Sequence, residues 1–252
     1  MPMYPFAIDL STSTLTFLTQ RLTAHRAAIG SRWRKLPTGR QALLVLAHLR
    51  CGDTYARLAA GFGIGTATVY RYIHEAVDLL TALGPDLAEA MRTARHKAYL
   101  ILDGTLIRID RVALDRPYYS GKYKRHGVNL QVLADPAGRL VWVSPGLPGA
   151  THDLTAARTD GLIGALTEAE RKTYADKASQ GAGQWIRVPY RGHGLAAGPK
   201  AVNRSHAKVH ALGEPAVATI KTWRILRRYR GCPTRITGLA TTILVLHLQP
   251  AR

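Results

Sequence analysis

Apolar residues in the first 95 positions recur every three or four residues, as on one face of an amphipathic helix, whereas later apolar residues form short β-branched runs. The helical spacing is clearest over residues 15–22, 43–49 and 69–80, and Pro37 and Pro85 interrupt it. The pattern therefore predicts an all-helical N-terminal part that ends near residue 95.

The second part of the chain predicts strands before helices. Residues 99–109 (YLILDGTLIRI), 128–134 and 140–143 are of strand type, and the sequence Asp-Pro-Ala-Gly at 135–138 predicts a hairpin turn between the last two. A helix is predicted over 153–166, capped by Thr151 or Asp153, and a strand over 172–175 that ends at Asp176. A Gly-rich basic loop follows over 181–198. Helical spacing then returns over 201–229, with interruptions at Gly213 and Pro215. This order predicts an α/β domain with a mixed sheet.

The charge balance narrows the class of partner. The chain has 35 Lys and Arg against 16 Asp and Glu, a net charge of +19, which predicts a polyanionic partner such as nucleic acid or an anionic membrane face. No apolar run approaches the roughly 18 to 20 residues that cross a bilayer, and no basic leader precedes an apolar stretch, so a soluble, unsecreted protein is expected. Two distant cysteines, Cys51 and Cys232, argue against a disulfide framework or zinc finger.

Residues 55–73 (YARLAAGFGIGTATVYRYI) have the spacing of a helix-turn-helix. Ala59 allows close approach of a second helix, Gly63 suits a turn with positive φ, and Ile64, Val69 and Ile73 can pin the second helix to the first. With Thr66 as the expected helix cap, the candidate DNA-facing residues are Thr66, Thr68, Tyr70, Arg71 and His74. A purely structural helical hairpin is the alternative.

Carboxylates are scarce in the second part, so their positions are informative. Glu214 is the only acidic residue from position 177 to the end, and it is either a surface ion-pair partner or a metal ligand. Asp103 lies inside a predicted strand, where an uncompensated charge is costly, and Asp176 ends a strand expected beside it. Asp153 follows His152 at a helix start. Such oxygen clusters suit Mg²⁺ or Mn²⁺, and two ions about 3.5 to 4 Å apart promote phosphodiester displacement.

Four segments carry a family resemblance: LILDGTLI (100–107), PGATHDLTAAR (148–158), YADKASQGAG (174–183) and ALGEPAVATIKTWRIL (211–226). They resemble the DDE transposases of bacterial insertion sequences and their Harbinger-like relatives over roughly residues 38–248. The resemblance implies a helical DNA-binding domain over 1–95, with its helix-turn-helix at about 38–80, followed by a ribonuclease H-like mixed-sheet catalytic domain over 96–252. It also implies divalent metal, Mg²⁺ or Mn²⁺, with two ions expected.

By position, the resemblance makes Asp103, Asp176 and Glu214 the catalytic carboxylates and adds Asp153 as a fourth metal ligand. Lys221, seven residues after Glu214, matches a family spacing and would share its helix face, where it could hold a phosphate. Two departures stand out: Ala178-Ser179 replaces a common Gly-Tyr, and Pro215 replaces a common Arg. Since proline is tolerated only in the first turn, Pro215 is expected to restart a helix.

Two further basic segments are candidates for DNA contact. Residues 118–126 (YYSGKYKRH) contribute Lys122, Lys124 and Arg125, and residues 223–230 (WRILRRYR), expected to continue the helix of Glu214, contribute Arg224 and Arg228. Solvated basic surfaces are the plainer interpretation of both.

Together these features predict a transposase that binds element-end DNA and catalyses metal-dependent phosphodiester hydrolysis and strand transfer. The alternatives are a non-catalytic helix-turn-helix DNA-binding protein or inactive remnant, and a metal-dependent repair or RNA nuclease that uses the same carboxylates. The expected partners are double-stranded element ends and target DNA, with a homodimer or larger assembly and no membrane. The expected location is the bacterial cytoplasm, on the nucleoid.

Overall fold

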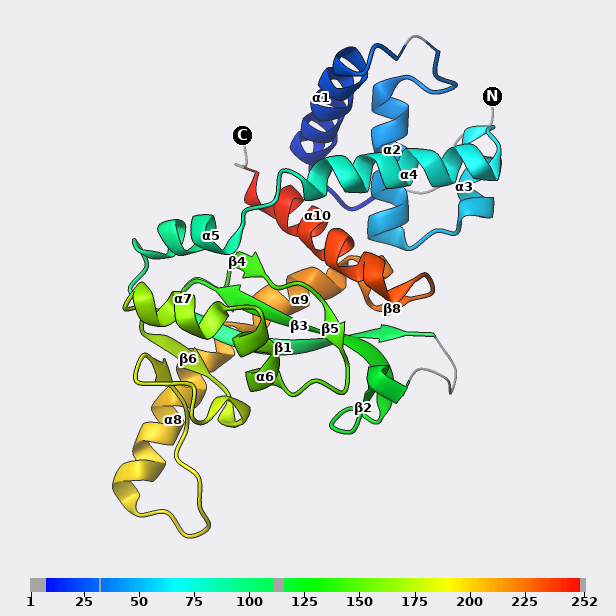
Figure 1. Ribbon diagram of the computed structural model, residues 1–252. Helices are drawn as coiled ribbons and strands as arrows, with labels where there is room; N and C mark the ends of the chain where they lie inside the picture. The colour runs from blue at the N-terminus through cyan, green and yellow to red at the C-terminus, as the bar shows by residue number, and fades with distance from the viewer. Residues whose placement is uncertain (1–7, 32, 111–115, 250–252) are drawn as a thin grey trace.

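The computed structural model describes residues 8–31, 33–110 and 116–249, which form a helical N-terminal part followed by a mixed sheet covered by helices (Figure 1). The helices of the N-terminal part are α1 (Thr12–Ala28), α2 (Thr38–Cys51), α3 (Tyr55–Phe62), α4 (Thr66–Thr81) and α5 (Leu87–Ala94). The helical character predicted before residue 95 is therefore confirmed.

The sheet has the order β2-β3-β1-β6-β7, with β4 and β5 paired to β3 and β8 paired to β1. Its strands are β1 (Leu100–Ile109), β2 (Tyr119–Ser120), β3 (Arg125–Ala134), β4 (Leu140–Val143), β5 (Leu147–Pro148), β6 (Thr173–Ala175), β7 (Ile186–Arg187) and β8 (Arg228–Tyr229). β1 is antiparallel to β3 and parallel to β6. The four predicted strands and their mixed pairing are confirmed.

Helices cover both faces of this sheet, which confirms the α/β class. They are α6 (Asp153–Thr159), α7 (Leu162–Glu168), α8 (Ala197–Ala211), α9 (Glu214–Thr222) and α10 (Ile236–Leu248), with short 3₁₀ turns at Arg116–Tyr118, Lys177–Ser179, Arg224–Leu226 and Pro233–Arg235. Figure 1 shows α5, α6 and α7 on one face, α9 behind the sheet, and α8 projecting at the end farthest from the N-terminal helices.

Alternate residues of β1 enter two different cores. Ile101 and Ile107 join a core with α2, α4, α9 and α10, whereas Leu100 and Leu102 join a second core with α5 and α7. Because successive strand residues point to opposite faces, Asp103 shares the face of Ile101 and Ile107, and Gly104 shares the face of Leu102. This alternation determines which candidate carboxylates face one another.

The predicted helix over 153–166 is two helices, because Gly161 takes a left-handed φ of 70° between α6 and α7. Its N-cap is His152, without a side-chain capping hydrogen bond, so the expectation of Thr151 or Asp153 as the cap was wrong. The cap of α4 is likewise Gly65 rather than Thr66, which is the first helical residue.

The predicted helical stretch over 201–229 is divided three ways. α8 ends at Ala211, and α9 restarts at Glu214 with Pro215 in its first turn, as proline requires. The helix ends at Thr222, since Trp223 has extended backbone angles. The expected continuation of this helix through residues 223–230 was therefore wrong: a 3₁₀ turn follows, and β8 then pairs with Arg108 and Ile109 of β1.

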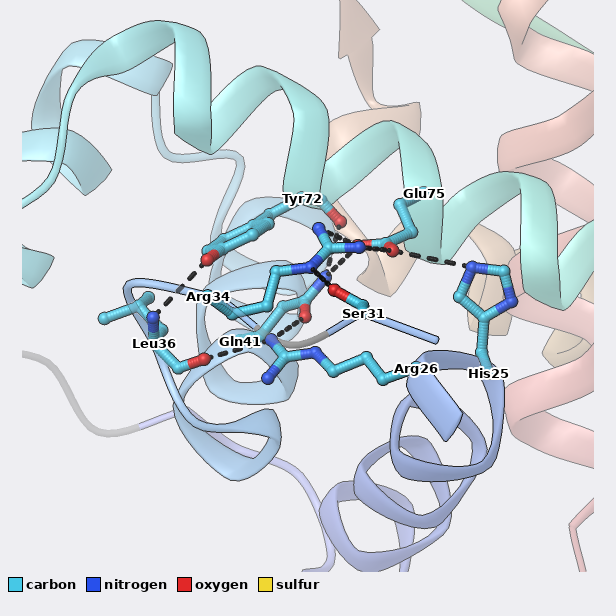
Figure 2. A network of polar contacts seen from close by, with 8 residues as sticks. All are labelled: His25, Arg26, Ser31, Arg34, Leu36, Gln41, Tyr72 and Glu75. Atoms are coloured by element: carbon cyan, nitrogen blue, oxygen red, sulfur yellow. Dashed lines mark hydrogen bonds and ion pairs between the residues drawn. The ribbon is translucent and has the colours of Figure 1, made fainter. Parts of the chain in front are cut away.

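A polar network ties α1, α2 and α4 of the N-terminal part together (Figure 2). The Glu75 carboxylate on α4 accepts hydrogen bonds from Arg34 (2.7 and 3.3 Å) and from the fully buried Gln41 (2.9 Å). His25 of α1 lies 3.5 Å from the same carboxylate. Since the side chain of Glu75 is only 14% exposed, the network satisfies a charge that would otherwise be costly to bury.

α10 connects the N-terminal helices to the sheet. It packs against α4 on one side and β4 on the other, and Thr81 of α4 donates a hydrogen bond to the Gly238 carbonyl (3.1 Å). One continuous apolar core consequently runs from α1 to the sheet face that carries Asp103.

Candidate active site

Asp103 and Asp176 lie at neighbouring positions of two parallel strands. Leu102 of β1 pairs with Ala175 of β6, and each aspartate follows its paired residue directly. Because parallel strands run in the same direction, both carboxylates are carried to the same region of the sheet. The expectation that the strand of Asp176 lies beside that of Asp103 is thereby confirmed.

The surroundings of Asp103 disfavour its ionised form. Burial raises the pKa of this carboxyl, and the negative charges of Asp176 and Asp153 raise it further, while His210 and a backbone hydrogen bond at Gly104 act in the opposite direction. The net shift is upward. Burial is the main cause, and a bound cation would offset the cost of ionising this carboxyl.

Asp153 opens α6 and is held in place by hydrogen bonds. Asn129 of β3 donates to its Oδ1 (2.8 Å) and also to the Thr151 carbonyl (2.9 Å). Gly104 makes room for the carboxylate, since a Cβ at that position would lie 2.6 Å from the Asp153 Oδ1. Asp153 is therefore fixed against β1 on the Gly104 face of the strand.

Asp176 caps the short 3₁₀ turn that follows β6. Its Oδ1 accepts a hydrogen bond from the Ala178 backbone N–H (2.9 Å), which leaves Oδ2 directed elsewhere. Ser179, at one of the positions that depart from the family, is the last residue of this turn and is buried.

Lys122 forms an ion pair with two of the candidate carboxylates. Its Nζ lies 3.0 Å from Asp153 Oδ2 and 3.8 Å from Asp176 Oδ2. Burial would lower the pKa of this ammonium, but the hydrogen bond and charge of Asp153, with smaller contributions from Tyr123 and Asp176, outweigh burial and raise it. Lys122, Asn129, Asp153 and Asp176 line a cavity of about 330 Å³.

Glu214 is the first residue of α9, and its side chain is exposed. Within the described ranges the Glu214 side chain makes no hydrogen bond or ion pair. Its charge is also not among those that shift the pKa of Asp103. The preceding Gly213 packs against Ile101, so the start of α9 lies over the sheet face that Asp103 shares. Lys221 is exposed near the end of the same helix.

His210 is the α8 side chain that approaches Asp103. Its Nε2 lies 3.4 Å from the Leu102 carbonyl, next to Asp103 in the chain, and its ring is stacked with that of His206 at 6.1 Å. The sequence offers no signal for Asn129, and it marks His210 only as one of several basic residues before Glu214, without a role at the site. His210 lies four residues before Glu214 in the sequence, near the end of the preceding helix.

The strand alternation separates the four carboxylates. Asp103 and the start of α9 belong to one face of β1, Asp153 to the other, and Asp176 to the strand end beside them. Accordingly, in the part of the chain that the structure describes, no three His, Cys, Asp or Glu side chains are grouped closely enough to hold a metal ion. The donor chemistry nevertheless fits Mg²⁺ or Mn²⁺, because it consists of carboxylate oxygens and already attracts the Lys122 ammonium.

The helix-turn-helix has the predicted geometry. Gly63 ends α3 with a φ of 67°, and Leu58, Val69 and Ile73 are buried between α3 and α4. The candidate DNA-facing residues lie on the outside of α4: Thr66, Tyr70 and Arg71 are exposed, and Thr68 and His74 are half-buried. Tyr70 stacks on His74, with ring centroids 3.8 Å apart.

The other basic candidates fall into two groups. Lys124 and Arg125 are exposed beside Lys122 at the start of β3. Arg224 and Arg228 are exposed near β8, where Arg228 donates a 2.6 Å hydrogen bond to Asp110. Since the helix ends at Thr222, these arginines do not share a helical face with Lys221.

Comparison with known families decides the class of protein. Residues 102–247 match the family described as DDE superfamily endonuclease, and residues 34–86 match the helix-turn-helix of DDE superfamily endonuclease. The chain belongs to the DDE superfamily endonucleases. In this DDE chain the endonuclease match includes Asp103, Asp153, Asp176 and Glu214, and the helix-turn-helix match includes α3 and α4.

A curated relative agrees with this family. The DDE chain is 33% identical over 223 residues to the "Putative transposase for insertion sequence element IS112" of Streptomyces albus G, which covers 86% of this chain and 81% of that protein. No solved structure matches the chain. None of the helices in the described ranges combines the length and apolarity needed to span a membrane.

Proposed function

We propose that this chain binds the ends of an insertion sequence and uses Asp103 and Asp176 to cut DNA and join it to a target. The observation that carries the proposal is the pairing of β1 with β6, which gives two carboxylates adjacent strand positions. The upward direction of the Asp103 pKa shift, caused mainly by burial, adds support, since carboxyls with shifted pKa values are enriched at reaction sites. The N-terminal region, 1–95, would bind DNA, and the region 96–252 would carry the catalytic residues.

Asp103 and Asp176 would hold the divalent metal, with Asp153 and Glu214 as further ligands. When bound, Mg²⁺ or Mn²⁺, expected as two ions, would stabilise the negative charge on the reacting phosphate as a Lewis acid. The chain's own contribution is to orient these oxygens. Asn129 fixes Asp153, and the Ala178 N–H fixes Asp176, so that each aspartate keeps one oxygen free of backbone or amide donors.

The proposed reaction has two steps, hydrolysis of the element end and transfer of that end to target DNA. A water oxygen attacks an end phosphodiester, a new P–O bond forms, and the bond to the 3′ oxygen breaks, leaving a free 3′ hydroxyl and a 5′ phosphate. That hydroxyl then attacks a target phosphodiester, forming the joint and releasing a target 3′ hydroxyl. Lys122, beside Asp153 and Asp176, would hold the negatively charged phosphate, and Lys124, Arg125 and Lys221 would neutralise the adjoining backbone.

A non-catalytic DNA-binding protein is the second candidate, and the exposed, unpartnered Glu214 among the described residues favours it. In such a protein the helix-turn-helix and basic surface would act without cleavage. If the chain does act as a transposase, joining two ends at once would require a homodimer or larger assembly.

Strand transfer separates these functions. The native chain should nick supercoiled plasmid with Mg²⁺ or Mn²⁺ and join a labelled oligonucleotide end to it, whereas Asp176→Asn should bind DNA equally and do neither. If Glu214→Gln also loses both reactions, α9 must move Glu214 toward Asp103 in the working complex. Metal-dependent nicking without joining would favour a repair or RNA nuclease, and no metal-dependent reaction by the native chain would favour the non-catalytic protein.

A further inference from the structure

A cleft of about 400 Å³ lies apart from the carboxylates, where the turn between α2 and α3 meets the segment from Arg224 to Gly231. One wall comes from the N-terminal helices and the other from the 3₁₀ turn and β8 that follow α9. None of the four candidate carboxylates lines it. The cleft therefore joins the two family regions of the chain at a place that the catalytic proposal does not use.

The lining of this cleft is strongly basic. Arg224, Arg228 and Arg230 line it, and Asp53 is the one acidic lining residue in the described ranges. Asp53 is only 8% exposed and forms an ion pair with Arg57 (3.3 Å), so its charge is already balanced.

Arg224 is the arginine of the described lining that has no anionic partner. Asp110, outside the lining, pairs with Arg228 (2.6 Å) and Arg230 (3.5 Å). The Arg224 guanidinium has no hydrogen bond or ion pair to any residue that the structure describes, although it stands at the cleft. A positively charged, unpaired guanidinium at a cleft is suited to bind a phosphate group.

Aromatic contacts connect the cleft to the outer surface of α4. Tyr55 lines the cleft and meets Tyr70 edge to face, with ring centroids 5.9 Å apart, and Tyr70 stacks on His74. Tyr229 also lines the cleft, and burial raises the pKa of its hydroxyl to about 12. This hydroxyl, protonated at neutral pH as in other tyrosines, can donate a hydrogen bond.

We propose that this cleft binds a backbone phosphate of the same DNA duplex that α4 contacts, with Arg224 as its principal ligand. The inference rests on DNA binding by the helix-turn-helix. In helix-turn-helix complexes the first helix crosses the DNA backbone while the second lies in the major groove. The cleft borders the start of α3, the first helix of the pair, so a backbone that passes α3 reaches Arg224. The duplex is then held by both halves of the chain.

The salt dependence of binding tests this contact. A fluorescein-labelled duplex of random sequence is titrated with the full-length chain over a range of salt concentrations. Loss of one phosphate contact should reduce the slope of log K against log salt by about 0.9, so Arg224→Ala should show this reduction. The matched control is Arg204→Ala on α8, which removes the same charge from an exposed position remote from the cleft and should keep the native slope.

The outcomes separate this inference from the function on which it rests. An unchanged slope for Arg224→Ala, together with a reduced slope for Arg71→Ala on α4, would overturn the proposed phosphate contact in the cleft. DNA binding by α4 would still stand. Failure of the native chain to bind duplex would overturn both. An equal reduction by Arg204→Ala would also overturn the proposal, because the effect would then reflect net charge alone.

The rate of Cys51 alkylation shows directly whether bound DNA covers the cleft. Cys51 is half-buried in the cleft wall, so in a Cys232→Ser background the duplex should slow its reaction with a maleimide severalfold. The protection should be lost in the Arg224→Ala background at salt concentrations where the native chain remains bound. A Cys51 labelling rate that bound duplex leaves unchanged would overturn the proposed placement.

Discussion

At the scale of single residues, the sequence predicts candidate carboxylates but not the side chains that contact them. Asp103 could be singled out because a lone charge in an apolar strand is costly, and Asp176 because it ends the next parallel strand. The contacts of Asn129 with Asp153, and of His210 with the Leu102 carbonyl, join residues 24 and 108 positions apart. Such contacts depend on the folded register and leave no local pattern in the sequence.

Lys122 acts as the counter-ion of Asp153 and Asp176, and its removal has a measurable consequence. Because its ammonium competes with any other cation for these oxygens, Lys122→Met should raise the affinity for Mn²⁺ in the absence of DNA. The side chain is 54% exposed, so the expected gain is at most about fivefold, which corresponds to an ion pair of about 0 to 1 kcal/mol.

Electron paramagnetic resonance of free Mn²⁺ measures this affinity. Lys124→Met provides the control, since Lys124 is an exposed lysine of the same loop without an ion pair to the described carboxylates. Equal affinities for the Lys122 and Lys124 variants would show that Lys122 does not occupy the cation position.

At the scale of elements, long periodic segments were predictable and short ones were not. The helices up to residue 95 and strands β1, β3, β4 and β6 follow apolar periodicity, which the fold obeys. β2, β5, β7 and β8 have two residues each, too few for any period. The break at Trp223 was also missed, because β8 is extended by its pairing with β1 rather than by its own sequence.

Two acidic residues of α4 should contribute very differently to stability. Glu75 is the acceptor of the network in Figure 2, with its side chain 14% exposed, whereas Asp78 pairs with Arg235 at the surface and is 63% exposed. Glu75→Gln should lower the free energy of unfolding by about 1 to 3 kcal/mol, because it leaves Arg34 and Gln41 without their charged acceptor. Asp78→Asn should cost about 0 to 1 kcal/mol.

Urea unfolding followed by circular dichroism compares these two variants. Equal midpoints would contradict a structural role for the network. A larger loss for Asp78→Asn would mean that the surface ion pair, rather than the buried one, holds α4.

At the scale of the whole molecule, the change of pattern near residue 95 predicted two parts, and the two family matches agree with that order. The sequence could not show that the parts share a core. The last described helix, α10, packs between α4 and β4. This contact joins residues that are far apart in the sequence, so no local pattern predicts it.

The shared core predicts cooperative unfolding. Scanning calorimetry of the native chain should give a single transition whose calorimetric and van't Hoff enthalpies agree. Two resolved transitions, one for each family region, would contradict a common core.

The central proposal is that Asp103 acts in DNA cleavage and not in DNA binding. The most direct measurement follows plasmid nicking with Mn²⁺ and duplex affinity in the same preparations of the native chain, Asp103→Asn and Glu168→Gln, an exposed acidic control on α7. We predict equal affinities for all three and a nicking rate for Asp103→Asn at least about 100-fold below the other two. Undiminished nicking by Asp103→Asn would contradict the proposal.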